Sequence, residues 1–113
     1  MNSKVRITDV APRDGLQAES SLIDTSTKAQ LVELVQKTGV REVEVSSFVS
    51  PKWIPQLGDA SKLFEMIATT KPEGVLYSAL IPNQRGLESA LGVNDHAKSE
   101  HGIDRLIDKV SVF

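Results

Sequence analysis

The residues best suited to chemistry form one short stretch, Ala11–Gln17, with the sequence Ala-Pro-Arg-Asp-Gly-Leu-Gln. Arg13 offers a fixed fork of N–H donors, which suits an oxyanion or a thioester oxygen. Asp14 offers hard carboxylate oxygens that suit a divalent cation, and the Gln17 amide can both donate and accept hydrogen bonds. Gly15 allows a sharp turn or a close approach of the backbone to a ligand. Taken alone, the stretch is more typical of a surface turn, because Asp-Gly is a common turn dipeptide.

The composition indicates a globular protein of one domain or part of one. The chain has 113 residues, of which 40% are hydrophobic and 25% charged, and its formal net charge is −2. This balance gives no electrostatic reason to expect nucleic acid. The absence of cysteine excludes disulfides, thiolate metal sites and a cysteine nucleophile within this sequence. No apolar run approaches the roughly 18 residues of a membrane span.

The first four residues run directly into the first predicted strand, which leaves no room for a signal or transit peptide. We therefore expect a cytoplasmic protein, with the mitochondrial matrix as the alternative if the source is a eukaryote. No membrane association is expected.

Strand-like and helix-like segments alternate along the chain. The predicted strands are Val5–Val10, Val40–Val45, Val75–Ile81 and Val110–Phe113. The first predicted helix begins at Thr25 or Ser26, either of which could cap it, and stops at Gly39. The second runs from Ala60 to Thr69, and the third includes Leu87, Ala90 and Leu91. The polar segment Asn94–Asp104 is predicted as a loop. This order indicates a parallel sheet with helices outside it, because parallel strands need crossover connections.

Burial can be predicted for several side chains. Inward positions are expected at Val5, Ile7 and Val10 in the first strand, at Leu31, Leu34 and Val35 in the first helix, and at Leu63, Phe64 and Ile67 in the second. In the second strand, one of Glu42 and Glu44 is expected to face solvent and the other to point toward a site at the strand's end. The loop Ser46–Asp59 is too apolar for a solvated linker, so Phe48 and Trp53 are expected to pack beneath it.

The distinctive residues follow the ends of predicted strands. Both doubly wound sheets and eight-stranded barrels place their sites there, and periodicity alone does not separate the two folds. No Gly-x-Gly-x-x-Gly and no phosphate-loop motif follows the first strand, which disfavours a nucleotide-binding doubly wound sheet.

Three blocks resemble the 3-hydroxy-3-methylglutaryl-CoA lyase family in sequence, order and spacing. They are Val10–Gln17, Val43–Gln56 (VEVSSFVSPKWIPQ) and Leu80–Asn83 (LIPN). The Arg-Asp-Gly-x-Gln core is also shared with isopropylmalate and homocitrate synthases and with biotin-dependent carboxyltransferase domains. The Ser-Phe-Val-Ser-Pro-Lys-Trp block is the part that singles out the lyase branch.

The resemblance implies a (β/α)8 TIM barrel that cleaves 3-hydroxy-3-methylglutaryl-CoA to acetyl-CoA and acetoacetate, a step of leucine degradation and ketone body formation. The implied cofactor is Mg²⁺ or Mn²⁺, with Asp14 as a metal ligand. Arg13 would bind the substrate and donate to the thioester carbonyl as enolate charge develops. Gln17 would bind substrate near the metal. Glu44 matches the family's active-site glutamate, and we assign it to orienting Arg13 and the metal-bound groups rather than to proton transfer.

The implied partner is a small acyl-CoA substrate, and the resemblance leaves a homo-oligomer open. Lys52 lies where it could approach a CoA phosphate, but a solvated lysine is the expectation. His96 and His101 fall outside the matched blocks, and we expect them to be surface residues rather than metal ligands.

The sequence departs from the family in two respects. About a dozen extra residues near Asn94–Leu106 lengthen the connection into the fourth strand, an insertion expected away from the catalytic face. A complete barrel needs eight βα units and about 250 residues, whereas only the first three units and the fourth strand are predicted here. Residues 1–113 are therefore expected to be an incomplete, N-terminal portion of a pyruvate-carboxyltransferase-like barrel. The family's metal-binding histidines and asparagine and its loop cysteine lie in the missing part.

Three functions stay open on these grounds. The first is the metal-dependent lyase, with this chain alone inactive because Asp14 would leave most of the six or so oxygen positions of a divalent ion to water. The second is a related Claisen-type acyl-CoA synthase or a carboxyltransferase, disfavoured by Leu16 and by the block Val49–Gln56. The third is a non-catalytic truncated remnant that associates through an exposed strand edge.

Overall fold

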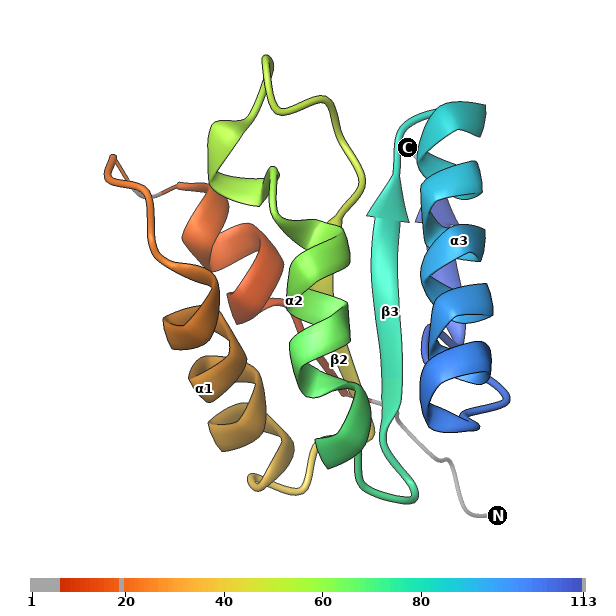
Figure 1. The fold of residues 1–113 in the computed structure, drawn as a ribbon. Helices are drawn as coiled ribbons and strands as arrows, with labels where there is room; N and C mark the ends of the chain where they lie inside the picture. Colours follow the sequence, from red (N-terminus) through yellow and green to blue (C-terminus); the bar gives the residue numbers. More distant parts are fainter. Residues whose placement is uncertain (1–6, 19, 113) are drawn as a thin grey trace, which may run out of the picture.

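One parallel sheet organises the chain, which a computed structural model describes for residues 7–18 and 20–112 (Figure 1). Its strands are β1 (Thr8–Asp9), β2 (Glu42–Ser47), β3 (Leu76–Ile81) and β4 (Lys109–Val112), in the spatial order β1-β2-β3-β4. Each strand is thus added beside the preceding one, as in a βα barrel. A doubly wound sheet would reverse direction at its switch point. Strand order therefore favours the barrel of the two predicted folds.

Three helices connect these strands. They are α1 (Thr25–Gln36), α2 (Ala60–Ile67) and α3 (Gln84–His101), with short helical turns at Ala11–Gly15, Pro55–Leu57 and Ala68–Thr70. Within the described residues, no helix has the length and apolar character needed to cross a membrane.

The core lies between the helices and one face of the sheet. The sheet contributes buried side chains from β2 and β3, namely Val43, Val45, Tyr77, Ala79 and Ile81. The predicted inward residues of α2, which are Leu63, Phe64 and Ile67, are all buried. The Phe64 ring stacks on Phe48 at a centroid distance of 5.8 Å and tilts against Tyr77 at 6.5 Å. These ring contacts add packing energy beyond area burial, and they join the segment after β2 to α2 and β3.

The opposite face of the sheet carries charged side chains that are nevertheless buried. Glu42 is 2% exposed and Glu44 is 8% exposed, so the prediction that one of them faces solvent was wrong. Residues two apart on a strand share a face, and both carboxylates have cationic partners there. Lys109 on β4 lies 3.4 Å from both Glu42 oxygens, and Arg13 contacts Glu44. Burial of a carboxylate is tolerable when it is paired in this way.

The residue that caps the first helix lies one position before the predicted ones. The Asp24 side chain, rather than that of Thr25 or Ser26, caps α1 by accepting a hydrogen bond from Thr27 N at 3.0 Å. Hydrogen bonds from Thr27 lower the pKa of Asp24 below its ordinary value. The helix ends at Gln36, three residues before the predicted stop at Gly39. Gly39 has a φ of 91°, in the left-handed region that favours glycine.

Several predicted core residues are exposed instead. The predicted residues that reach solvent are Ile7, Val10, Leu34 and Trp53, the last of which is 84% exposed, and Leu91 of the third helix is exposed as well. β1 comprises only two residues and is paired on one side within the described sheet, which leaves its flanking residues uncovered. Leu34 and Leu91 lie away from the buried stripes of their helices, and Trp53 lies in the loop after β2. Val5 and Phe113, also assigned to strands, lie outside the described residues.

The segment predicted as the loop Asn94–Asp104 is mostly helical, which corrects that prediction. α3 continues to His101 because its buried stripe continues through Ala90, Val93 and Ala97, and it ends at Gly102 with φ 68°. The polar composition of the segment reflects its solvent-facing side. The residues that were expected to lengthen a loop therefore belong mostly to a helix.

The end of α3 is fastened by side chains of this extension. Asn94 Nδ2 donates to Ile107 O at 3.0 Å and Asn94 Oδ1 accepts from Ile107 N at 2.7 Å. His96 and His101 lie on the surface with their Nε2 atoms 3.1 and 3.0 Å from Glu65 of α2. The hydrogen bond to His101 lowers the pKa of Glu65. The extension is thereby attached to both α2 and the segment leading into β4.

Two glycines of α3 provide a matched test of this packing. A Cβ at Gly86 would lie 2.8 Å from the Phe48 carbonyl oxygen, whereas a Cβ at Gly92 would meet nothing within 4 Å. We expect Gly86→Ala to lower the free energy of unfolding by about 1–3 kcal/mol through overpacking. Gly92→Ala should raise it by about 0.5–1 kcal/mol because alanine favours the helix. Urea denaturation followed by circular dichroism measures both, and equal effects of the two substitutions would contradict the described contact.

Candidate active site

The four predicted site residues lie around one guanidinium group. Arg13 Nε donates to Glu44 Oε1 at 2.5 Å. Arg13 Nη1 lies 3.3 Å from Asp14 Oδ1 and 3.4 Å from Gln17 Oε1. The structure therefore brings together groups from the segment after β1 and from β2. Arg13 and Glu44 are 31 positions apart in the sequence.

The local chain path explains why Arg13 reaches Glu44. Directly after β1 the backbone winds into the helical turn Ala11–Gly15, in which Asp14 N donates to Val10 O at 2.7 Å. The Asp9 carboxylate accepts a hydrogen bond from Ala11 N at 2.8 Å and so anchors the start of the turn. Asp9 was not identified from the sequence, although an Asp side chain that accepts from the backbone N–H two residues on is a common feature of turns. The stretch is therefore a turn, as its composition favours, and it carries three of the four candidate site residues.

The contacts of Arg13 leave one edge of its guanidinium available. Nε and Nη1 are engaged as described, and no contact between described residues uses Nη2. The side chain is largely buried, whereas that of Asp14 is 65% exposed. A guanidinium held on one side by a carboxylate presents its remaining donors in a fixed direction. The arrangement can therefore bind an anionic or developing oxyanion oxygen beside an accessible carboxylate.

An irregularity in β2 determines which side chains follow Glu44 on its face of the sheet. Glu44 pairs with Ser78, but the register shifts so that Ser47, rather than Ser46, pairs with Leu80. Such a bulge re-aims the side chains beyond it. Ser47 Oγ donates to Leu80 O at 2.9 Å. Ser47 therefore lies on the same face of the sheet as Glu44. In a regular strand without the shift, Ser46 would occupy that face.

The loop that follows β2 is fixed at both of its ends. Phe48 N donates to Leu80 O at 3.0 Å. At the far end, the Lys28 side chain is buried, and its Nζ contacts Asp59 Oδ1 at 2.7 Å and Gln56 O at 2.5 Å. Phe48 is buried as predicted. The loop therefore packs over one end of the domain, as its apolar composition indicated, with Trp53 as the exception.

Comparison with known proteins matches this geometry to one family. The model of the HMGL-like family matches residues 4–102. The chain belongs to the HMGL-like family. The hydroxymethylglutaryl-CoA lyase YngG of Bacillus subtilis is 49% identical over 94 residues, which cover 81% of this chain and 31% of that protein. The chain thus spans about a third of the length of this relative.

Solved lyase structures show the same fold. The HMG-CoA lyase from Brucella melitensis superposes with a TM-score of 0.82 at 36% identity, over 99% of this chain and 35% of that one. A lyase from Acinetobacter baumannii, solved in complex with coenzyme A and 3-methylmalate, gives 0.75 at 38% identity over 79% of this chain and 28% of that one. These matches confirm the predicted barrel family and the predicted relationship to the carbon–carbon lyases.

The candidate metal ligands of this chain are oxygen atoms, the type of ligand that a hard divalent cation prefers. Asp14 presents an accessible carboxylate, and the Gln17 carbonyl oxygen lies on the same guanidinium edge. Carboxylate and amide oxygens are ligands that Mg²⁺ accepts. Within the described residues, however, no three His, Cys, Asp or Glu side chains are grouped so that they could hold a metal ion. The described residues therefore supply only part of a coordination sphere.

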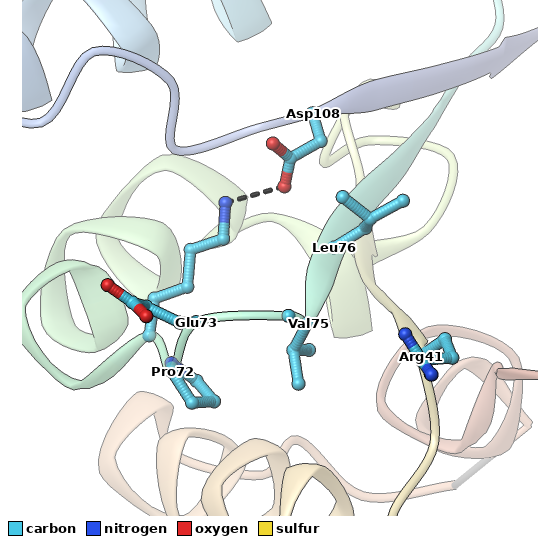
Figure 2. Close-up of a pocket in the computed structure, with 8 residues that line it drawn as sticks. Arg41, Pro72, Glu73, Val75, Leu76 and Asp108 are labelled. Carbon is cyan, nitrogen blue, oxygen red and sulfur yellow. Dashed lines mark hydrogen bonds and ion pairs between the residues drawn. The ribbon is translucent and has the colours of Figure 1, made fainter.

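The opposite end of the sheet is occupied by a structural ion pair. A cavity of about 400 Å³ there is lined by Arg41, Glu73 and Asp108, among others (Figure 2). Lys71 Nζ lies 2.5 Å from Asp108 Oδ2 and also donates to the Leu106 carbonyl at 3.1 Å. The same Asp108 oxygen accepts from Tyr77 N at 2.9 Å. These groups fix β4 beside β3, in agreement with a stabilising role for this end of a barrel.

The pairing of Arg13 with Glu44 can be tested without a ligand. Glu44→Gln removes the charge but keeps the shape, so we expect the Arg13 Nε–H resonance in ¹H–¹⁵N spectra to lose its hydrogen-bonded position. The free energy of unfolding should fall by about 1–3 kcal/mol because a hydrogen bond between charged groups is weakened. Glu88→Gln on the exposed side of α3 is the control and should change neither quantity. An unchanged Arg13 signal in Glu44→Gln would show that this contact does not hold Arg13 in solution.

Proposed function

We propose that this chain provides the part of an active site in which 3-hydroxy-3-methylglutaryl-CoA is cleaved to acetyl-CoA and acetoacetate. The observation that carries the proposal is the Arg13 guanidinium, held by Glu44 with its Nη2 edge unused among the described contacts and with the accessible Asp14 beside it. Family membership and the lyase names of its relatives support the same reaction.

The reaction needs a donor where Arg13 is proposed to act. When the tertiary hydroxyl loses its proton, its oxygen forms a carbonyl and the bond between C2 and C3 breaks. The electron pair of that bond passes to the thioester, which leaves as an enolate and is protonated to acetyl-CoA. Negative charge therefore develops on the thioester oxygen, and a donor fixed beforehand stabilises it most effectively. Arg13 Nη2 is assigned to that oxygen.

Glu44 is a positioning residue in this scheme. Its carboxylate accepts the hydrogen bond from Arg13 Nε, which fixes the plane of the guanidinium and thus the direction of its other donors. Because this carboxylate is committed to Arg13, we do not assign it to proton transfer. Gln17, whose Oε1 lies 3.4 Å from Arg13 Nη1, limits rotation of the same group from the other side and is proposed to bind substrate.

Asp14 is proposed to hold a divalent cation, Mg²⁺ or Mn²⁺. When bound, such an ion makes a coordinated hydroxyl more acidic and polarises carbonyl oxygens. Asp14 would contribute one carboxylate and Gln17 is the nearest neutral oxygen donor. Since a divalent ion of this kind takes about six oxygen ligands, we propose that further ligands come from outside residues 1–113 and that this chain alone is inactive.

A chimera tests the proposed activity. Residues 4–102 would replace the matched segment of the Bacillus subtilis lyase, and release of acetoacetate from 3-hydroxy-3-methylglutaryl-CoA would be measured. We expect the chimera to be active and Arg13→Gln to lower kcat by about 10²–10³-fold, as for loss of an oxyanion donor. Arg41→Gln, an exposed arginine at the other end of the sheet, is the matched control. A folded chimera that makes no acetoacetate, or an Arg13→Gln variant as active as the control, would refute the proposal.

Asp14 can be tested in the 113-residue chain itself. We expect Mn²⁺ to broaden the NMR signals of residues 13–17 selectively and only at high metal concentration, because one carboxylate binds weakly. Asp14→Asn should abolish this broadening, whereas Asp95→Asn on the exposed side of α3 should not. Broadening that persists in Asp14→Asn would place the metal elsewhere.

A further inference from the structure

Lys28 is a buried cation in the first turn of α1, and the scheme above gives it no role. Its side chain is 3% exposed, and its Nζ contacts Asp59 Oδ1 at 2.7 Å and the Gln56 carbonyl oxygen at 2.5 Å. The other oxygen of the same carboxylate, Asp59 Oδ2, accepts from Thr25 Oγ1 at 2.5 Å. A lysine with so little exposure is tolerated because these oxygens replace its water. Three polar contacts therefore bind the start of α1 to the end of the loop after β2.

These contacts join the two segments of chain that carry the candidate site. The segment after β1 contains Arg13 and leads into α1, whereas β2 contains Glu44 and leads into the loop that ends at Asp59. Figure 1 shows the two segments at the same end of the sheet. Arg13 and Glu44 link them beside the sheet, and Lys28 and Asp59 link them again beside the helices. The spacing of the two segments is thus fixed at two points.

Apolar packing alone would fix this spacing less sharply. α1 and α2 both contribute side chains to the core, Val32 and Leu63 among them, but the hydrophobic effect is non-directional. A lysine bound to a carboxylate and a carbonyl oxygen has a set position. A buried ion pair is weak evidence for stability, because an apolar pair of similar volume is often as stable, and its better-attested contribution is to select one arrangement of packed elements. The place of this pair indicates which arrangement it selects.

We infer that Lys28 is a positioning residue for the proposed reaction. By holding the loop after β2 against α1, it keeps the two segments at the spacing at which Arg13 Nε reaches Glu44. The direction of the remaining Arg13 donors depends on that contact, and the stabilisation of the thioester oxygen depends on their direction. Asp59 acts together with Lys28. This inference rests on the proposed function.

The 113-residue chain allows a test that needs no substrate. Lys28→Met keeps an unbranched apolar side chain and removes its charge. We expect the Arg13 Nε–H resonance of this variant to move toward its position in Glu44→Gln. Lys71→Met is the matched control, because Lys71 is a mostly buried lysine paired with Asp108 at the other end of the sheet. It should lower the midpoint of urea unfolding, as Lys28→Met does, but leave the Arg13 resonance unchanged.

The chimera tests the consequence for the reaction. Lys28→Met should lower kcat about tenfold with a smaller change in KM, because it alters the geometry at the reacting centre rather than a contact with substrate. Lys37→Met removes an exposed lysine directly after α1 and should change neither constant.

Two results would overturn the inference. One is a Lys28→Met chain that is destabilised as Lys71→Met is but keeps its Arg13 resonance, since Lys28 would then only stabilise the fold. The other is an active chimera whose kcat is the same with and without Lys28→Met.

A milder pair of variants keeps the test decisive if Lys28→Met does not fold. Asp59→Asn keeps the shape of its side chain and should still shift the Arg13 resonance, whereas Asp108→Asn should not, and equal spectra of the two would count against the inference. A chimera that makes no acetoacetate would refute the proposed reaction alone, because the Arg13 resonance reports the positioning without substrate.

Discussion

The ion pair between Arg13 and Glu44 is the contact on which the arrangement of the site depends. It joins the turn after β1 to the middle of β2 across the buried face of the sheet. A charged pair in such a place is stable only if both partners are present, because either one alone would be a buried, unpaired charge. The other candidate residues lie around it, since Arg13 Nη1 is 3.3 Å from Asp14 Oδ1 and 3.4 Å from Gln17 Oε1.

Different kinds of groups lie at the two ends of the sheet. At the amino end, Lys71 and Asp108 hold β4 in register with β3, and the Asn94 side chain fastens α3 to the segment that leads into β4. At the carboxyl end, the register shift in β2 and the anchored loop after it shape the surroundings of Glu44. The contacts that fix β4 beside β3 and the candidate site therefore lie at opposite ends of the sheet, as in a βα barrel.

Local signals in the sequence were sufficient for the order of the elements, and they named four candidate residues that the fold brings together. Arg13, Asp14, Gln17 and Glu44 could be named because their types suit one reaction and their motifs resemble one family, and the fold brings them together. Burial was harder to predict, because it depends on partners that are distant in sequence. Glu42 is buried beside Lys109, a partner that is 67 residues away in the sequence.

The remaining differences have similar causes. The extension of α3 was missed because its buried stripe consists of small and widely spaced residues, while its polar residues dominate the composition. Trp53 was expected to pack beneath the loop after β2 because that loop is apolar, but the buried apolar side chains of the loop are Phe48 and Leu57 instead. Asp24 takes the role expected of Thr25 or Ser26, since capping is decided by backbone geometry within one residue.

The most direct test is a crystal structure of the chimeric lyase with 3-hydroxy-3-methylglutaryl-CoA bound to a slowly turning-over form of the enzyme. The account predicts that Arg13 Nη2 lies about 3 Å from the thioester oxygen, within hydrogen-bonding distance, while Nε still contacts Glu44. A structure in which Arg13 has left Glu44, or in which the thioester oxygen is bound by other groups, would contradict it.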